Sequence, residues 1–355
     1  MARKNILVLE PYYGGSHQSF LAGLQKYLPF SFHLITLPAR GWKWRMRFSA
    51  PYFAARLPAA RNCDALLCST FVDVAALRGM GPGWLREVPV FTYFHENQFA
   101  YPVQVEYERD MHFAVTNFTT ACCSDRVAFN SLYNMESFFM GCAAIEKKIP
   151  DMKLDMTKEL RKKSVVLHPG VDFSQLDAVP SAAHVNDRPV IIWNHRWEYD
   201  KNPELFFRTL FQLDDLQVDF QLVILGQSFE QQPEIFDKMR ERLGHRLLHV
   251  GYVTEREKYC QWLRRGTLIV STANHEFYGI AVIEAVRAGC RPLLPDRLSY
   301  PELFPPNYLY HDEDLLYRIR EGLQGRRLDD ISARELTEQF SWSALAGSYT
   351  EWLNT

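Results

Sequence analysis

The alternation of short apolar runs with amphipathic stretches is the feature that most constrains the fold of this chain. In the first half, apolar runs bounded by turn-forming residues recur at residues 6–9, 32–37, 65–68, 90–94, 126–129 and 165–167. Amphipathic stretches such as 16–27 and 131–140 lie between several of them. This alternation is typical of a parallel sheet covered by helices on both faces. We therefore predict an α/β domain over residues 1–170.

The same alternation restarts after residue 188. Residues 171–188 contain prolines, alanines and polar residues without a sustained period, which indicates a linker. Further strands are predicted at 189–193, 220–225, 247–250, 268–271 and 291–294, and helices at 203–213, 233–243, 255–264 and 278–288. We predict a second doubly wound domain over 189–339 and a terminal aromatic-rich helix over 340–355, capped by Ser341. Such sheets bind ligands at the carboxyl ends of their strands, so two of them predict a shared crevice.

Composition excludes several other classes of protein. Lys and Arg number 40 against 42 Asp and Glu, so no global charge indicates a nucleic acid or a membrane. Seven cysteines without a C-x-x-C pair indicate reduced thiols and a cytoplasmic protein. The apolar run after Arg3 and Lys4 is too short for a secretory signal, and no stretch is long enough to cross a bilayer, so we expect no integral membrane association.

The strongest chemical signal is the string HEFYGIAVIE at residues 275–284. It joins a predicted strand to a predicted helix and carries two carboxylates, Glu276 in the loop and Glu284 within the helix. A helix that begins near Gly279 offers free backbone N–H groups to an anion. A nucleotide sugar needs acceptors for its ribose, donors for its diphosphate and a polar group for its sugar. Taken alone, the pair also fits two surface glutamates around an ordinary turn.

A second signal follows the first strand of the second domain. Arg196 and Lys201 combine a planar guanidinium with a compact ammonium, which suits two adjacent phosphates. These cations would also stabilise a leaving diphosphate. The alternative is a solvated loop in which Arg196 pairs with Glu198 and Lys201 with Asp200. If the donor role holds, replacing Lys201 by alanine is expected to abolish activity with thermal stability nearly unchanged.

Two weaker signals lie in the first domain. Gly14 and Gly15 follow its first strand and open a helix, where glycines permit close approach of a ligand, although a plain tight turn explains them equally. The string HENQ at residues 95–98 ends another predicted strand. Polar groups buried there without partners would be costly, so we expect them to face the cleft. His95 is then a candidate to hydrogen-bond a sugar hydroxyl or to orient the acceptor.

One segment combines positive charge with aromatic rings. Its basic and aromatic side chains could contact phosphates and stack on bases of RNA; they are Arg40, Trp42, Lys43, Trp44, Arg45 and Arg47. A second basic cluster consists of Lys147, Lys148, Lys158, Arg161, Lys162 and Lys163. Charge runs of this kind are also common on solvated faces.

Motifs for metal and covalent chemistry are missing from the sequence. It has no H-E-x-x-H, no Cys and His at ligand spacing, and no G-x-S-x-G nucleophile elbow. The turn at Gly14 and Gly15 lacks both the P-loop pattern and the full dinucleotide pattern. We therefore expect neither a metal nor another cofactor.

Together, these motifs resemble the retaining, glycogen-synthase-like glycosyltransferases of the GT-B fold, which has two Rossmann-like domains. In that superfamily an arginine and a lysine hold the donor diphosphate, which implies these roles for Arg196 and Lys201. The second glutamate of the spaced pair binds ribose and the first acts at the sugar, which implies them for Glu284 and Glu276. The resemblance also implies front-face attack by the acceptor hydroxyl and a C-terminal helix that returns to the first domain.

A closer resemblance extends over nearly the whole chain. The strings concerned are YYGGSH at 12–17, LPARGWKWRMR at 37–47, YFHENQ at 93–98, FNSLYNMESF at 129–138, HRWEYDKNPE at 195–204 and HEFYGIAVIEA at 275–285. They look like the tRNA-queuosine α-mannosyltransferase family. This implies transfer of mannose from GDP-mannose to the cyclopentenediol of queuosine at the wobble position of the aspartate tRNA. It also implies that the segment with Trp42 and Trp44 contacts the anticodon arm.

Two alternatives remain open from the residues. One is a GT-B glycosyltransferase that uses another nucleotide sugar and a lipid or small-molecule acceptor. The other is a non-catalytic protein that binds tRNA or a nucleotide. The intact set of Arg196, Lys201, Glu276 and Glu284 argues against the second alternative.

Overall fold

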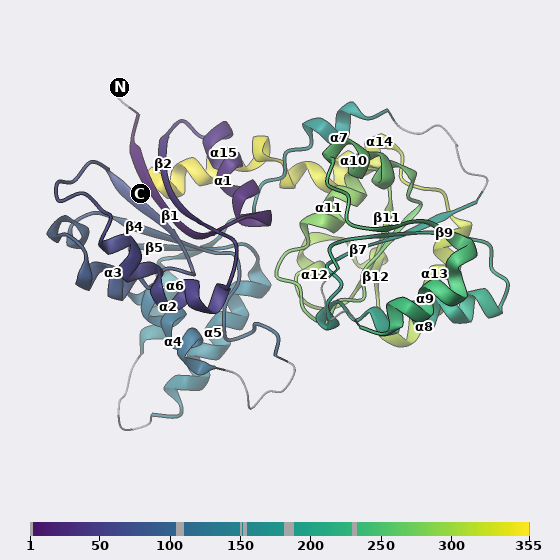
Figure 1. Ribbon diagram of the computed structural model, residues 1–355, viewed down its shortest axis with the longest axis horizontal. Coiled ribbons are helices and arrows are strands. Elements are labelled where there is room, and N and C mark those ends of the chain that lie inside the picture. Colours follow the sequence, from purple (N-terminus) through teal and green to yellow (C-terminus); the bar gives the residue numbers. More distant parts are fainter. Residues whose placement is uncertain are drawn as a thin grey trace. The chain divides into compact units, whose positions relative to one another are not determined.

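The computed structural model describes residues 3–103, 110–149, 151, 155–180, 188–228 and 233–354. The chain divides into two compact units. The first consists of Met1–Gly170 together with Trp342–Thr355, and the second is Val171–Ser341. Each unit is an α/β structure in which strands and helices alternate along the chain (Figure 1).

The described residues of the first unit form a sheet of six parallel strands in the order β2-β1-β3-β4-β5-β6. The strands are β1 (Asn5–Tyr13), β2 (Ser31–Pro38), β3 (Ala65–Ser69), β4 (Val90–Phe94), β5 (Arg126–Phe129) and β6 (Ser164–Val166). Each overlaps a predicted strand. The strand order reverses at β1, so the switch point of this sheet lies between β1 and β3.

Helices cover both faces of this sheet. They are α1 (Gly15–Tyr27), α2 (Trp42–Ala54), α3 (Val74–Met80), α4 (Met111–Cys123), α5 (Leu132–Glu146), α6 (Met156–Lys162) and α15 (Trp342–Asn354). Successive side chains of β1 enter different cores: Ile6 and Val8 pack with α1 and α15, whereas Leu7 and Leu9 pack with α2 and α3. A strand buried on both faces reads as a continuous apolar run, which explains the pattern at residues 6–9.

The C-terminal helix α15 packs in the core of the first unit, beside α1 (Figure 1, yellow). Trp342 lies so close to Gly23 of α1 that a Cβ at position 23 would come within 2.0 Å of its ring. The hydroxyl of Tyr349 donates to the carbonyl of His168 at 2.9 Å. The last helix therefore completes the hydrophobic core of the first unit.

The described residues of the second unit form another six-stranded parallel sheet, in the order β12-β11-β10-β7-β8-β9. Its strands are β7 (Val190–Asn194), β8 (Gln221–Leu225), β9 (Leu247–Gly251), β10 (Leu268–Val270), β11 (Arg291–Pro295) and β12 (Leu309–Tyr310). Counted from β7, this is the Rossmann order 3-2-1-4-5-6 read in reverse. The predicted α/β class is confirmed, and the switch point lies between β7 and β10.

Helices again cover both faces of the sheet. They are α7 (Ser174–Ala178), α8 (Pro203–Asp215), α9 (Ile235–Leu243), α10 (Arg256–Arg265), α11 (Ile280–Arg287), α12 (Tyr300–Leu303), α13 (Leu315–Gln324) and α14 (Asp330–Thr337). The segment predicted as a linker begins with structure of its own, because Val171, Phe173 and Leu176 are buried in the core of the second unit. The part of that segment at residues 181–187 lies outside the described residues.

Candidate active site

The two strongest motifs meet at the switch point of the second unit. The chain leaves β7 toward Arg196 and Lys201, and it leaves the neighbouring β10 toward Glu276. Parallel strands end at the same edge of a sheet, and ligands of such sheets bind at this reversal of strand order. The tertiary structure therefore brings together residues that are about 75 positions apart.

Lys201 is the centre of this arrangement. Its side chain is only 7% exposed, and its Nζ donates to the carbonyl of His275 at 2.6 Å. The same Nζ lies 3.2 Å from Asp200 Oδ2 and 3.4 Å from Glu276 Oε2. Burial alone would lower the pKa of Lys201, but the charges of Glu276 and Asp200 raise it above its ordinary value. The lysine is a buried, permanent cation rather than part of a solvated loop.

Glu276 is the complementary anion. Burial would raise the pKa of this carboxyl, but the charge of Lys201 holds it below its usual value. Its Oε1 lies 3.5 Å from the backbone N of Tyr278. Glu276 therefore stays ionised, with one oxygen directed to the lysine and the other toward the loop that precedes α11.

Arg196 is held differently from Lys201. Its guanidinium pairs with Glu198 at 3.1 Å, and its side chain is 53% exposed. Both pairs named as the alternative in the sequence, Arg196 with Glu198 and Lys201 with Asp200, are present. Only the first lies at the surface, where an ion pair contributes little and exchanges partners readily.

Glu284 lies on α11, where sequence reasoning expected it. Its Oε1 accepts from Arg256 and its Oε2 from the hydroxyl of Tyr259 at 2.8 Å. Asn194 at the end of β7 donates to that same hydroxyl at 2.8 Å. A carboxylate has about four acceptor positions, so Glu284 keeps capacity for ribose hydroxyls beside these two donors. Sequence reasoning missed Tyr259 and Arg256 because α10 gives no motif of its own.

Gly279 begins α11 as predicted. Its φ is +103°, a conformation that residues other than glycine rarely adopt. It is the residue immediately before Ile280, the first residue of the helix. The free N–H groups of the first turn of α11 follow directly. This arrangement suits an anionic group, although the role of Gly279 in donor binding stays a prediction.

His195 and His275 are buried imidazoles that sequence reasoning left without a role. Burial and the nearby Lys201 charge lower the pKa of each to about 4. Nε2 of His195 has no hydrogen-bond partner among the described residues. Both rings are therefore neutral beside the Lys201 and Glu276 charges.

Gly14 and Gly15 in the first unit serve different purposes. A Cβ at Gly14 would come within 2.7 Å of Ala39, so close packing against the end of β2 requires a glycine there. Gly15 has φ +52° and open space around its Cβ position. Only Gly15 leaves room for an approaching ligand, and the donor role of both glycines stays a prediction.

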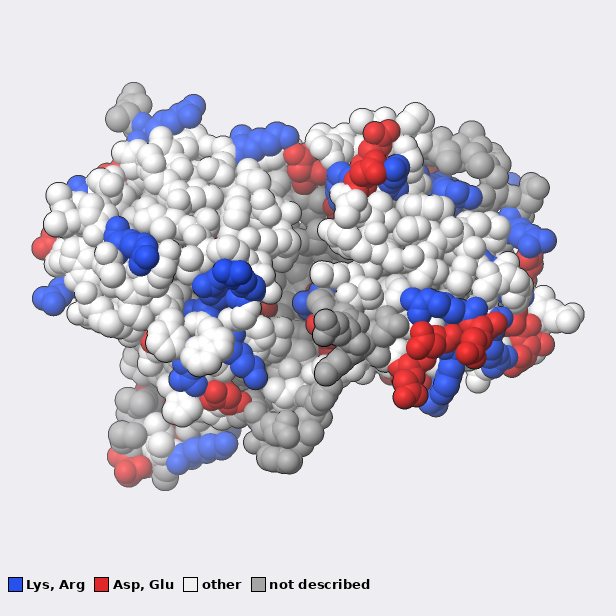
Figure 2. Space-filling view, in the orientation of Figure 1, with Lys and Arg blue, Asp and Glu red and all other residues white. Residues whose placement is uncertain are grey.

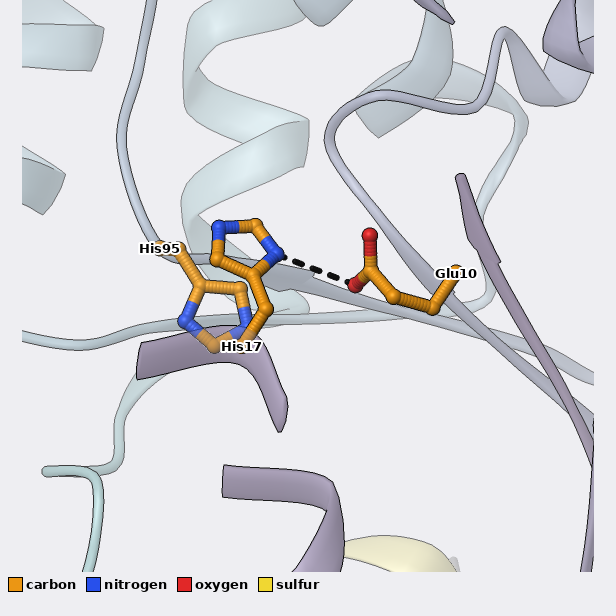
Figure 3. A group of neighbouring side chains, drawn as sticks. All are labelled: Glu10, His17 and His95. Carbon is orange, nitrogen blue, oxygen red and sulfur yellow. Dashed lines mark hydrogen bonds and ion pairs between the residues drawn. The ribbon is translucent and has the colours of Figure 1, made fainter. Parts of the chain in front are cut away.

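His95 belongs to a cluster with Glu10 and His17 at the carboxyl ends of β1 and β4 (Figure 3). Candidate ligand atoms of the three lie within 4.8 Å of one another. The imidazole rings of His17 and His95 are stacked, with centroids 3.9 Å apart and planes 29° apart. Lone pairs of stacked rings run along nearly parallel planes and do not converge on one ion. The arrangement is that of an ion pair with a stacked ring, rather than a coordination site.

The prediction that the whole HENQ string faces a cleft was wrong for its last two residues. Asn97 is fully buried, and its amide nitrogen donates to Asn134 and Ser137. Gln98 is also buried, and its backbone N donates to Asn117 at 2.8 Å. Burial costs little here because partners from α4 and α5 satisfy these groups. Only His95 and Glu96 remain partly accessible.

The basic and aromatic segment forms the first turns of α2, which the sequence did not predict as a helix because Pro51 lies inside it. Trp42 packs against Tyr101 and Phe113, so it contributes to folding. Trp44 is 70% exposed and lies against Phe48, which is also exposed. Blue side chains gather over the part of the first unit where Figure 1 shows α2 (Figure 2).

Two members of the second basic cluster pair with carboxylates of the first unit. Arg161 makes two hydrogen bonds with Glu136, and Lys162 pairs with Glu159. Lys163 donates to the carbonyls of Cys122 and Ser124. Arg47 of the first segment is paired in the same way, with Asp110 at 3.0 Å, so what distinguishes α2 is the exposed rings of Trp44 and Phe48. Among the described residues, helices long and apolar enough to cross a bilayer are absent.

Solved structures with the same architecture support the fold. The catalytic domain of starch synthase IV from Arabidopsis thaliana aligns with a TM-score of 0.71 and 14% identity over 99% of both chains. Sucrose-phosphate synthase from Thermosynechococcus elongatus aligns with a TM-score of 0.69 and 16% identity over 99% of this chain and 98% of that one. These similarities show the GT-B fold.

Sequence comparison gives the family. Residues 5–171 match the family model described as tRNA-queuosine alpha-mannosyltransferase N-terminal, and residues 176–313 match Glycosyl transferases group 1. A Drosophila melanogaster protein named tRNA-queuosine alpha-mannosyltransferase is 37% identical over 324 residues, which cover 89% of this chain and 85% of that protein. The chain therefore belongs to the tRNA-queuosine α-mannosyltransferase family.

Proposed function

We propose that this protein is a retaining glycosyltransferase that moves mannose from GDP-mannose to the cyclopentenediol of queuosine in the aspartate tRNA. The observation that carries the proposal is the 37% identity to the Drosophila melanogaster protein over 89% of the chain, which extends through both units. The charged cluster at the switch point of the second unit supports donor chemistry of this kind.

The donor half of the proposal rests on four side chains of the second unit. Glu284 accepts hydrogen bonds from the ribose hydroxyls, and Glu276 accepts from the mannose. Arg196 and Lys201 hold the diphosphate next to the first turn of α11. The burial of Lys201 supports its role, because a cation in a site of low polarity attracts a phosphate more strongly than one in water.

Donor binding would rearrange the ion pairs of the free protein. Lys201 now lies between Asp200 and Glu276, and Arg196 lies against Glu198. A diphosphate that arrives at Lys201 replaces part of the attraction of those carboxylates. Arg196 can leave Glu198 at little cost, since that pair is exposed. In the free protein Lys201 is therefore already charged and in place, and its charge is paired with Asp200 and Glu276.

The reaction itself requires no protein nucleophile. An acceptor hydroxyl attacks C1 of mannose on the face from which the diphosphate leaves, and a new C–O bond forms as the old one breaks. The proton of the hydroxyl passes to the departing phosphate oxygen. Lys201 and Arg196 stabilise the negative charge that develops there, and His95 orients the acceptor.

The acceptor half of the proposal assigns tRNA contact to α2. Trp44 and Phe48 offer exposed rings on which unpaired bases can stack, and Arg40 and Lys43 add positive charge beside them. Trp42 is an internal support of this surface rather than a contact. We therefore assign RNA contact only to the exposed residues of the segment.

We also propose that transfer needs no metal, because Arg196 and Lys201 supply the charge that a metal would otherwise provide. Activity should then persist after exhaustive treatment with EDTA, and loss of activity that zinc, magnesium or manganese restores would contradict this.

The seven cysteines are all free thiols, five of them buried, which supports a cytoplasmic protein.

The experiment that tests the function uses the full chain, tRNA with and without queuosine, and a panel of nucleotide sugars. Digested tRNA is analysed by mass spectrometry for nucleosides. We expect one added hexose on queuosine with GDP-mannose and none on guanosine-containing tRNA. Addition from another donor would correct the sugar, and no addition with any donor would overturn the proposal.

A further inference from the structure

Glu10 and His17 form a buried ion pair directly against His95 (Figure 3). The Glu10 residue is 2% exposed, and its Oε2 lies 3.1 Å from Nδ1 of His17. Its Oε1 accepts from the backbone N of Tyr12 at 2.8 Å and from the hydroxyl of Ser69 at 3.2 Å. These contacts fix the carboxylate at the switch point of the first sheet.

The ion pair favours the protonated form of His17. Burial would lower the pKa of His17, but the charge and the hydrogen bond of Glu10 raise it above its ordinary value, and Glu96 adds to this. Rings of Tyr12 and Phe71 enclose the rest of the imidazole. Glu10 from β1 and Glu96 after β4 are thus the anionic groups that act on His17.

His95 is kept neutral by its burial and by the contact with His17. Its ring stacks on His17 with centroids 3.9 Å apart, and it makes edge-to-face contacts with Phe20 and Tyr93 at centroid distances of 4.9 and 4.7 Å. Burial and the positive charge of His17 together lower the pKa of His95 well below its usual value. The surroundings therefore favour the protonated form of His17 and the neutral form of His95.

We propose that Glu10 and His17 are positioning residues that keep His95 uncharged and oriented for the acceptor hydroxyl. A neutral imidazole has one nitrogen that donates and one that accepts, whereas an imidazolium can only donate. Only the neutral form can accept a hydrogen bond from the other hydroxyl of the acceptor diol, while the attacking hydroxyl gives its own proton to the phosphate. The inference rests on the acceptor role of His95 in the proposed function.

The direct test follows the histidine Cε1–H signals of the full chain by NMR across pH, with His95→Asn and His17→Asn to assign the two rings. In the native protein we expect His17 to titrate at higher pH than His95. Glu10→Gln removes the anion that favours the protonated form of His17. The titration midpoint of His95 should then rise by less than the roughly 1 pH unit set by one close charge, because the Glu10 anion is removed as well. An unchanged midpoint would overturn the inference.

The activity test is the acidic limb of kcat/KM for mannosyl transfer. In Glu10→Gln this limb should move to higher pH together with the His95 midpoint. A shifted NMR midpoint with an unmoved limb would overturn the role of His95 charge in the reaction. If the native chain transfers no sugar, the proposed function fails, while the NMR titration still reports on the ion pair.

Two further variants separate charge from packing. Glu10→Gln combined with His17→Phe leaves no unpaired buried charge and keeps a ring on His95, so it should raise the midpoint of His95 as the single change does. A return to the native midpoint would assign the effect to packing and overturn the inference. Glu136→Gln, in a surface pair with Arg161, is the matched control and should leave His95 unmoved.

Discussion

The two units keep their candidate side chains in opposite electrostatic arrangements. In the second unit a buried lysine lies between two carboxylates, and the neighbouring His195 and His275 are neutral. In the first unit a single buried carboxylate raises the pKa of His17, and burial together with His17 lowers the pKa of His95. A lysine keeps its charge at every physiological pH and suits the binding of an anion, whereas a histidine can exchange hydrogen bonds with a hydroxyl.

The largest effect is expected from removing the cation of the second unit. Lys201→Ala should lower kcat/KM about 10²–10³-fold, because the leaving diphosphate loses a buried cation. It should also lower the free energy of unfolding by about 3–5 kcal/mol, since Asp200 and Glu276 become unpaired buried anions. The structure thus argues against the sequence-based expectation of nearly unchanged thermal stability. Steady-state kinetics and denaturant unfolding measure the two effects, and Lys201→Arg should recover most of the stability.

The next effect concerns donor affinity alone. Glu284→Gln removes a charged acceptor for the ribose and should weaken GDP-mannose binding by about 1.5–3 kcal/mol, or roughly 10- to 100-fold in Kd. Titration calorimetry with the donor measures it. Arg242→Ala, which breaks a surface pair with Asp215, is the control and should leave Kd unchanged. If the variant binds GDP-mannose with the same Kd as the native protein, Glu284 does not contact the donor.

A smaller effect is expected on the acceptor side. Trp44→Ala should weaken tRNA binding by about 1–3 kcal/mol through loss of base stacking, with no change in donor Kd or in thermal stability. Trp42→Ala should instead lower thermal stability, because its ring packs against Tyr101 and Phe113. Filter binding and thermal melts distinguish the two. Similar losses of tRNA affinity and stability in both variants would contradict the division of roles.

The smallest effect tests the charge states of the histidines. His195 has a native pKa of about 4, below its unfolded value, so acid favours the unfolded chain between pH 6.5 and 4. Lowering pH from 7.5 to 5.5 should remove roughly 1 kcal/mol of stability through this residue. His17 acts in the opposite direction: its raised pKa stabilises the fold below pH 6.5, and this is lost as pH rises through the native pKa.

His195→Asn should therefore flatten the acid loss of stability, and Glu10→Gln should steepen it. Chemical denaturation of each variant at pH 5.5 and 7.5 in the same buffer measures how much the free energy of unfolding changes with pH. Identical slopes in the two variants would mean that the units do not differ in the way proposed.

Much of the fold was predictable from the sequence because the inner strands, such as β3, β4 and β7, are buried on both faces and read as continuous apolar runs. The pattern at residues 190–194 is an example: Ile191 and Ile192 enter different cores of the same sheet. The helix α2 was missed because Pro51 and the charged residues of its first turns hide the helical period. Arg196, Lys201, Glu276 and Glu284 were identified from motifs, and their roles stay predictions.

What the sequence determined by itself is local: the order of strands and helices, the turn at Gly279 and the motifs that mark the family. Which charges pair was decided only by the tertiary structure. Lys201 meets Glu276 because β7 and β10 are neighbours, and Glu10 meets His17 because α1 folds back over the end of β1. Electrostatic energy depends on distance in space and on burial, neither of which a local sequence pattern records.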